Sequence, residues 1–342
     1  MKSAIVKDKT VEIQNISNPE LGSNDILVKM QACGICGSDV EKVFGEYGQP
    51  SMKLGHEPAG VIVTVGNDVK DFKKDDRVFT HHHVACYSED CHECSHGNET
   101  MCSKYHQSNL NPCGLADEYI VPEWNVKHGG ILKLPDSVSY EEAAMIEPLA
   151  CCVRTWNKFK FQNNDSVVIL GTGPTGVMHA MLAKHFGLGK IFCLDRNEFR
   201  LNFANKLEFI AINSNSIDIA DKIKTETENR GADIAIVATG NPLALKNAFS
   251  YVRKGGIVVL FGVPSKGEII DIDMSVVYSK EITLVTTYAA SDNDTKSALE
   301  LISSGNIDVK SLITHKYSLD ESMKAFEHAK SGDSAMKIII EN

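Results

Sequence analysis

The chain has 342 residues, a length that suggests about two domains of average size. Hydrophobic residues make up 43% and charged residues 23%, which is typical of soluble globular proteins and argues against a disordered chain. The 35 basic and 45 acidic side chains give a net charge of −10, which argues against nucleic-acid binding because such sites need a basic field. No apolar run reaches the roughly 20 residues of a membrane helix, and the start MKSAIVKDKTVEIQ lacks the apolar segment of a signal peptide. We therefore expect a cytoplasmic protein without membrane or nucleic-acid partners.

Short apolar runs separated by turn residues dominate the first third of the chain. This pattern predicts strands rather than helices. The expected strands are Ile26–Met30, Gly60–Val65, Arg77–Phe79 and Glu118–Val121. With few helical stretches among them, they indicate a small, β-rich, barrel-like domain.

From about Tyr140 the pattern changes to alternating strands and helices. Ser139 and Glu142 have the spacing of a capping box, which predicts a helix start. The expected strands that follow are 167–170, 190–194, 234–237, 257–260 and 282–285, with helices at 174–186 and up to about 207, and a tail of two helices near 295–303 and 318–330 and a strand at 337–340. Because these strands are apolar throughout, they predict a parallel sheet covered on both faces.

The motif Gly171-Thr172-Gly173-Pro174-Thr175-Gly176 lies between a predicted strand and a predicted helix. Glycines in this pattern allow a tight turn and the close approach of a pyrophosphate to a helix N-terminus. Asp195 ends the next predicted strand, where a carboxylate binds the adenosine ribose and favours NAD over NADP. Arg196 and Arg200 weaken that preference, since an arginine accommodates a 2′-phosphate. The alternative is an ordinary glycine-rich turn.

Four of the ten cysteines, Cys86, Cys91, Cys94 and Cys102, lie within 17 residues of one another. Four thiolates bind zinc tetrahedrally and leave no open position, so this pattern predicts a structural zinc. A redox pair at Cys91 and Cys94, or chance clustering, are the alternatives; His-Glu between two cysteines is unlike a thioredoxin-type motif.

Cys36-Gly37-Ser38-Asp39 and Gly55-His56-Glu57-Pro58 supply a second, dispersed set of metal-ligand types. Three protein ligands plus water are typical of a catalytic zinc, and Glu147 is a candidate for the third. Neither segment is persuasive alone, because a lone cysteine is usually a core residue and a lone His-Glu pair is usually exposed. The tract His81–His83 has three open interpretations: a metal tract, one histidine lining a substrate cleft, or simple solvent exposure.

Taken together and in this order, these motifs resemble the zinc-containing medium-chain dehydrogenase/reductase superfamily over nearly the whole chain. Glu147-Pro148 resembles the branch of sorbitol and threonine dehydrogenases. The resemblance implies an α/β fold with a GroES-like, β-rich catalytic domain at 1–150 and 289–342, a structural zinc lobe at about 81–105, and an inserted Rossmann domain, a doubly wound parallel sheet, at 151–288.

The resemblance also implies the roles of individual residues. Cys36 and His56 are implied zinc ligands, with Glu147 as the third, directly or through water, and Glu57 beside the ion. Ser38 matches the hydroxyl that passes on the substrate proton, and Asp39 the carboxylate that orients His56. Lys337 matches the basic residue that faces Glu57. Gly171, Gly173, Pro174, Thr175, Gly176, Asp195 and Arg200 are the implied cofactor-binding residues.

Two departures from the family pattern stand out. Four residues separate Cys86 from Cys91 where the family usually has two, and Glu41 stands where many relatives end the proton relay in histidine. That relay is therefore expected to end on Glu41, or on the cofactor ribose and water.

The implied activity is hydride transfer between NAD (with NADP as an alternative) and an alcohol or polyol, or its carbonyl, with two zinc ions per chain and a homo-tetramer or dimer. A reductase of aldehydes or semialdehydes, such as succinate semialdehyde, is the alternative within enzymes. A nucleotide-binding structural protein on this fold is the alternative outside them. Substrate choice is expected to depend on loops such as Phe44–Gln49 and His106–Asn111.

Overall fold

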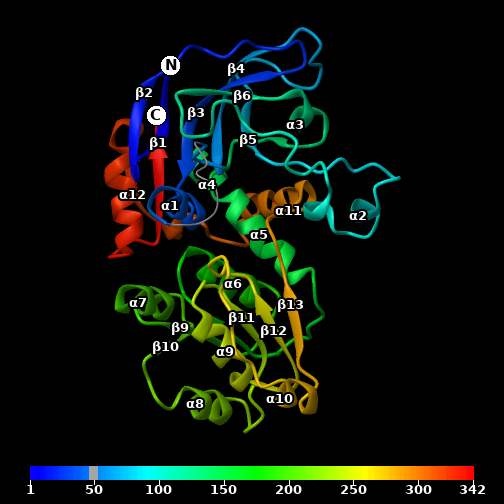
Figure 1. Cartoon of the computed structure of the whole chain (residues 1–342), viewed down its shortest axis with the longest axis vertical. Coiled ribbons are helices and arrows are strands. Elements are labelled where there is room, and N and C mark those ends of the chain that lie inside the picture. Colours follow the sequence, from blue (N-terminus) through cyan, green and yellow to red (C-terminus); the bar gives the residue numbers. More distant parts are fainter. Residues whose placement is uncertain (46–52) are drawn as a thin grey trace. The chain divides into compact units, whose positions relative to one another are not determined.

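The computed structural model of the chain describes residues 1–45 and 53–342. Most of the expected substrate loop at 44–49 lies outside these residues. The chain divides into two compact units: unit 1 is Met1–Cys151 with Ala289–Asn342, and unit 2 is Cys152–Tyr288. Each unit has its own sheet and its own core (Figure 1).

Unit 1 is built on a seven-stranded sheet in the order β14-β15-β3-β4-β5-β7, with β6 also paired to β3. β3 is its central strand, because it pairs antiparallel with β4, β6 and β15. β1 and β2 form a separate two-stranded sheet. The strands of unit 1 are β1 (Lys2–Lys7), β2 (Thr10–Asn15), β3 (Ile26–Gly34), β4 (Pro58–Val65), β5 (Arg77–Thr80), β6 (Glu118–Val121), β7 (Ile131–Lys133), β14 (Ile313–Ser318) and β15 (Lys337–Glu341).

The C-terminal strand β15 belongs to the same sheet as β3, β4 and β5 from the first third of the chain. In β15, Ile339 pairs with Gly34 and Ile340 with Cys33 of β3. Figure 1 shows this as the red strand β15 near the blue strands that begin the chain. The polypeptide therefore returns to unit 1 after completing unit 2.

Short helices connect and cover the strands of unit 1. α4 begins at the predicted capping box: Ser139 Oγ accepts from the Glu142 N–H at 3.2 Å, and Glu142 Oε2 accepts from the Ser139 N–H at 2.9 Å. The helices are α1 (Gly37–Phe44), α2 (His92–Ser95), η1 (Glu99–Met101), α3 (Glu123–Lys127), α4 (Tyr140–Ala143), α5 (Ile146–Trp156, which runs into unit 2), α11 (Asp292–Ser303), η2 (Lys310–Leu312), η3 (Leu319–Glu321) and α12 (Ser322–Ser331). α1 follows β3 directly and was not among the predicted elements.

Unit 2 is a six-stranded parallel sheet in the order β10-β9-β8-β11-β12-β13. Every residue of β8 and β11 is buried, as expected for strands with both faces covered. Its elements are β8 (Val167–Leu170), α6 (Pro174–His185), β9 (Ile191–Asp195), α7 (Glu198–Lys206), β10 (Ile210–Asn213), α8 (Ile219–Glu226), β11 (Ala232–Val237), α9 (Pro242–Tyr251), β12 (Val252–Leu260), α10 (Met274–Ser279) and β13 (Thr283–Thr286). The predicted α/β fold class is confirmed.

None of the helices in the described part of the chain is both long enough and apolar enough to cross a lipid bilayer.

Phe326 on α12 is fully buried in the core of unit 1 and provides a test of that packing. We expect Phe326→Ala to lower the free energy of unfolding by about 3–5 kcal/mol, because the lost ring leaves a cavity. Urea-induced equilibrium unfolding measures the change. Met101, which is 53% exposed, supplies the control Met101→Ala, with an expected effect within about 0.5 kcal/mol. Equal effects of the two substitutions would contradict this packing.

Candidate functional site

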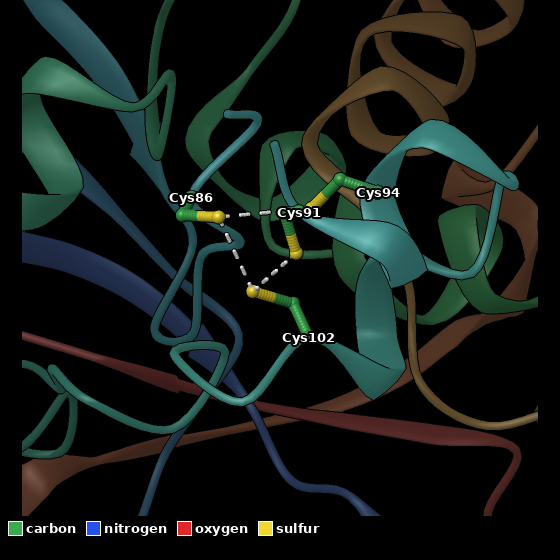
Figure 2. A group of neighbouring side chains, drawn as sticks. All are labelled: Cys86, Cys91, Cys94 and Cys102. Atoms are coloured by element: carbon green, nitrogen blue, oxygen red, sulfur yellow. Dashed lines mark hydrogen bonds between the residues drawn. The ribbon is translucent and has the colours of Figure 1, made fainter. Parts of the chain in front are cut away.

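The four predicted zinc cysteines lie together in unit 1 (Figure 2). Cys91 precedes α2, Cys94 lies within it and Cys102 follows η1, so two short helical turns present three of the sulfurs. Cys102 Sγ is 3.5 Å from Cys86 Sγ and 3.7 Å from Cys91 Sγ, and Cys86 Sγ is 3.9 Å from Cys94 Sγ. Cys86 thus joins the group although four residues separate it from Cys91.

This donor set fits a tetrahedral zinc. Four sulfurs that each lie about 2.3 Å from one ion are about 3.8 Å apart, which matches the distances between these sulfurs. Burial raises the pKa of the Cys102 thiol, but backbone N–H groups of Cys86 and Lys104 donate to its sulfur and bring the pKa to about 7. The thiolate form of Cys102 is therefore accessible near neutral pH.

A second group of ligand atoms comes from Cys36, His56 and Glu57, which also lie in unit 1. Cys36 is the N-cap residue of α1, whereas His56 and Glu57 immediately precede β4. One ligand atom from each of the three residues lies within 4.8 Å of the other two. A thiolate, an imidazole and a carboxylate are all zinc ligands, so the chemistry of the group fits that ion.

Asp39 fixes the orientation of His56. Its buried carboxylate lies 3.1 Å from His56 Nδ1 and accepts a hydrogen bond from Lys42 Nζ at 3.0 Å. Burial raises the pKa of Asp39, but His56 and Lys42 outweigh it and hold this pKa well below its usual range. Because Nδ1 is engaged by a carboxylate, the other ring nitrogen, Nε2, is left to bind a metal.

Glu57 forms a buried ion pair with Lys337 of β15. Lys337 Nζ donates to Glu57 Oε2 at 2.5 Å, whereas the buried Oε1 has no hydrogen-bond partner within the described part of the chain. An unpaired buried carboxylate oxygen beside a cysteine and a histidine fits a cation-binding site. Burial raises the pKa of Glu57, and the charge of Lys337 opposes that rise.

The structure does not place Glu147 in this group. Glu147 lies on α5, is 5% exposed, and its Oε1 accepts from Cys151 Sγ at 3.4 Å. Its charge still raises the pKa of Glu57. Among the described residues, the carboxylate that groups with the expected ligands is therefore Glu57, adjacent in sequence to His56, and not Glu147.

Ser38 is the second residue of α1 and is exposed. It follows Cys36 by two residues. Glu41, one turn further along α1, is also exposed. Both side chains of the expected proton relay are therefore accessible to water.

The histidines at 81–83 follow β5 and are not a solvent-exposed tract. His81 is 1% exposed, and its Nδ1 lies 3.0 Å from Asp292 Oδ1 at the start of α11. The ring of His82 lies 5.1 Å from that of His56. The interpretation as simple solvent exposure is therefore wrong for His81. The run of three consecutive histidines was the only sequence signal that this segment contacts His56.

In unit 2, the glycine-rich motif forms the turn between β8 and α6. Gly171 has φ +94°, a conformation that favours glycine, and Gly173 is the N-cap of α6 with Pro174 as its first residue. A Cβ on Gly176 would lie 1.9 Å from the carbonyl oxygen of Gly171, so only glycine fits there. The turn leads into α6, a twelve-residue helix that begins Pro174-Thr175. The N-terminus of such a helix can bind an anion.

Asp195 ends β9 and faces this turn. Its Oδ2 accepts from the Thr172 N–H at 2.8 Å, and its Oδ1 accepts from the N–H groups of Arg196 and Asn197. Arg200 Nη1 lies 3.6 Å from Asp195 Oδ2. Asp195 and Arg200, both predicted to bind the cofactor, therefore lie side by side.

Comparison with known proteins agrees with this fold. Residues 22–136 match the alcohol dehydrogenase GroES-like domain, and residues 174–304 match the zinc-binding dehydrogenase family. The sorbitol dehydrogenase of Bacillus subtilis is 34% identical over 96% of this chain and 93% of its own length. The L-threonine 3-dehydrogenase of Yersinia enterocolitica is 31% identical over 98% of both chains. The solved structure of 2R,3R-butanediol dehydrogenase from Bacillus subtilis superposes with a TM-score of 0.87 at 25% identity, covering 100% of this chain and 99% of that one.

A GroES-like domain followed by a parallel nucleotide-type sheet defines the class of zinc-binding dehydrogenases. The chain belongs to the zinc-containing medium-chain dehydrogenase/reductase superfamily and is an oxidoreductase of the alcohol dehydrogenase type. The predicted family and enzyme class are confirmed.

Gly34 tests how closely the Glu57–Lys337 pair is packed. A Cβ on Gly34 would lie 1.8 Å from Glu57 Oε2 and 2.9 Å from Lys337 Cε, so we expect Gly34→Ala to displace the pair. Overpacking of this kind costs about 1–3 kcal/mol of stability, measured by urea-induced unfolding. A Cβ on Gly37 would meet no other atom within 4 Å, which makes Gly37→Ala the matched control. An unchanged stability of Gly34→Ala would disprove this close contact.

Proposed function

We propose that this chain transfers a hydride between a nicotinamide cofactor and a secondary alcohol of a polyol or similar hydroxylated substrate, or its carbonyl. The observation that carries the proposal is the group formed by Cys36, His56 and Glu57, with Asp39 behind the imidazole. Full-length similarity to a sorbitol dehydrogenase and to a threonine dehydrogenase supports this substrate class. The proposed catalytic domain is 1–150 with 289–342, the proposed nucleotide-binding domain is 151–288, and the proposed location is the cytoplasm.

Cys36, His56 and Glu57 are the residues that would hold a catalytic zinc. Glu147, whose charge raises the pKa of Glu57, would take part directly or through water. The chemistry that such an ion supplies when bound is Lewis acidity toward the alcohol oxygen, which lowers the pKa of the hydroxyl. Asp39 keeps the His56 ring in its ligand orientation. Lys337 balances the charge of the buried Glu57 carboxylate.

Ser38 is the proposed first acceptor of the substrate proton. Its exposed hydroxyl follows the Cys36 ligand by two residues, so it can accept a proton from the alcohol and pass it to water or to the cofactor ribose. Glu41 is exposed on the same helix and is the alternative end of this relay.

The turn formed by Gly171, Gly173, Pro174, Thr175 and Gly176 would bind the cofactor pyrophosphate at the N-terminus of α6. Bound nicotinamide supplies a carbon that accepts or returns the hydride. Asp195 would bind the adenosine ribose hydroxyls, and its charge favours NAD. Arg200 contacts Asp195 and partly neutralises that charge, which leaves NADP as a weaker alternative.

The four-cysteine group would hold a second, structural zinc, for a total of two ions per chain. Its four protein ligands leave no position for a substrate.

A homo-oligomer, a tetramer or a dimer, is the proposed assembly. β13 is an edge strand of its sheet, and Leu284 on it is 47% exposed. Met274 and Tyr278 on α10 are 63% and 87% exposed. Exposed apolar side chains beside an unpaired strand edge favour pairing with a second copy. Sedimentation equilibrium tests this, and a monomer at micromolar concentration would refute it.

A spectrophotometric panel that follows NADH and NADPH with alcohols, polyols, threonine and aldehydes tests the proposed reaction. We expect the highest kcat/KM in the oxidative direction for a polyol or a hydroxy amino acid. Turnover of an aldehyde or semialdehyde about a hundredfold above every alcohol would favour the reductase instead. No turnover in either direction with full zinc content would favour a non-catalytic role.

Replacing one cysteine in each group separates the two proposed metals. We expect Cys36→Ser to lose about one zinc per chain and nearly all turnover. This variant should still bind NADH, because Cys36 lies in unit 1 and the glycine-rich turn lies in unit 2. Cys94→Ser should lose the other zinc and lower the melting temperature. Zinc analysis, NADH fluorescence and thermal unfolding make the measurements. Cys113→Ser, a buried cysteine outside both groups, should keep both ions. Undiminished turnover in Cys36→Ser would eliminate the proposed catalytic site.

The charge of Asp195 is the basis of the expected preference for NAD. Asp195→Asn removes that charge with little change of shape, so we expect the NAD:NADP ratio of kcat/KM to fall at least about tenfold, or about 1.4 kcal/mol. Asp218→Asn, on an exposed site of the same unit, is the control. An unchanged NAD:NADP ratio of kcat/KM in Asp195→Asn would show that Asp195 does not bind the adenosine ribose.

A further inference from the structure

The three histidines after β5 differ in how their rings are held. His81 Nδ1 lies 3.0 Å from the carboxylate of Asp292, and His83 Nδ1 lies 2.9 Å from the carbonyl oxygen of Ser108. His82, between them, has a buried Nδ1 without a hydrogen-bond partner in the described part of the chain. The outer two rings thus have protein partners for Nδ1, and the middle one does not.

His82 lies beside the proposed catalytic metal group but outside it. Its ring centroid is 5.1 Å from that of His56, with the two planes tilted by 51°. The group whose ligand atoms come together consists of Cys36, His56 and Glu57. His82 is therefore a neighbour of His56, a residue of the proposed catalytic metal group.

The backbone around His82 is fixed. Asn125 Nδ2 donates to the carbonyl oxygens of His81 and His82, at 2.7 Å and 3.1 Å, and Asn125 itself is fully buried. The ring of His83 lies 4.1 Å from that of His82. A polar group that is held this firmly by its neighbours is preorganised for a ligand.

A buried polar nitrogen without a partner costs about 1–3 kcal/mol, so such an atom beside a small-molecule site indicates that the ligand supplies the partner. An imidazole offers one donor and one acceptor in its neutral form, which suits a hydroxyl group. Of the three histidines, only His82 combines this unpaired nitrogen with contact to the ring of His56.

We propose that His82 is a specificity-determining residue that binds a second hydroxyl group on the carbon adjacent to the reacting alcohol, and so selects vicinal diols and polyols over monoalcohols. This inference rests on the proposed function and adds the substrate class that the site prefers. A site that hydrogen-bonds a substrate hydroxyl discriminates strongly against the analogue without it, because the protein group is then left unpaired.

Two alcohols that differ by one hydroxyl test the inference: vicinal secondary butanediol and secondary butanol. For His82→Phe we expect kcat/KM for the diol to fall about 10- to 100-fold, with the monoalcohol changing less than about threefold. His82→Gln, which keeps a donor and an acceptor, should recover part of the diol activity. His185→Phe, the same substitution at an exposed histidine of unit 2, is the control.

The result that would overturn the inference is a diol preference that stays the same in His82→Phe, whether both activities persist or both fall together. A parallel fall with a raised KM for the nicotinamide would assign His82 to the cofactor instead. Zinc content is measured on every variant, and His82→Ala replaces His82→Phe if the larger ring impairs folding.

Calorimetric titration of the diol into the enzyme without nicotinamide cofactor provides a readout that does not need turnover. Weaker binding to His82→Phe than to the wild-type enzyme supports the role of His82, and equal binding refutes it. If the wild-type enzyme oxidises neither alcohol, the proposed function fails, and the calorimetric comparison still decides the role of His82.

Discussion

Two of the carboxylates that unit 1 buries, Asp39 and Glu57, lie at the proposed catalytic metal group, and that group depends on how their charge is balanced. Asp39 and Glu57 are both fully buried, and each is held by a cationic side chain, Lys42 and Lys337 respectively. Removing one partner from such a pair leaves a buried charge that costs about 3–5 kcal/mol, so the partners must be positioned before the site can exist. His56 lies between these two carboxylates: Asp39 engages its Nδ1, and Glu57 is its neighbour in sequence.

This requirement explains why the chain returns to unit 1 after unit 2. Lys337 lies on β15, which pairs with β3 through Ile339 and Gly34. Because Gly34 has no side chain, the ammonium group of Lys337 and the carboxylate of Glu57 can meet directly over it. The C-terminal strand thus joins β14 to β3 in the sheet and also supplies the charge that pairs with the buried Glu57.

Sequence patterns predicted the features that depend on residues close together in the sequence. They did not predict the features that depend on contacts between residues far apart in the sequence. The glycine turn at 171–176, the capping box at Ser139 and the fully apolar strands of unit 2 follow from local spacing, and each occurs as expected. The grouping of Glu57 rather than Glu147 with the ligand cysteine and histidine depends on the pairing of β3 with β4, which no local pattern encodes. α1 was missed because its eight residues begin with glycine and serine, which are weak helix formers.

The cysteine lobe also makes a contact with a residue far away in the sequence, and this contact comes from its unusually long gap between Cys86 and Cys91. Tyr87, in the longer gap after Cys86, has φ +48° and donates to Asp292 Oδ2 at 2.9 Å. The other oxygen of Asp292 lies 3.0 Å from His81 Nδ1, so one buried carboxylate joins the lobe to the end of β5. Asp292 therefore links the lobe to the segment that follows β5 and carries His82. Through Tyr87, the four-residue gap, a departure from the family pattern in the sequence, connects the four-cysteine group to the region beside the proposed catalytic group.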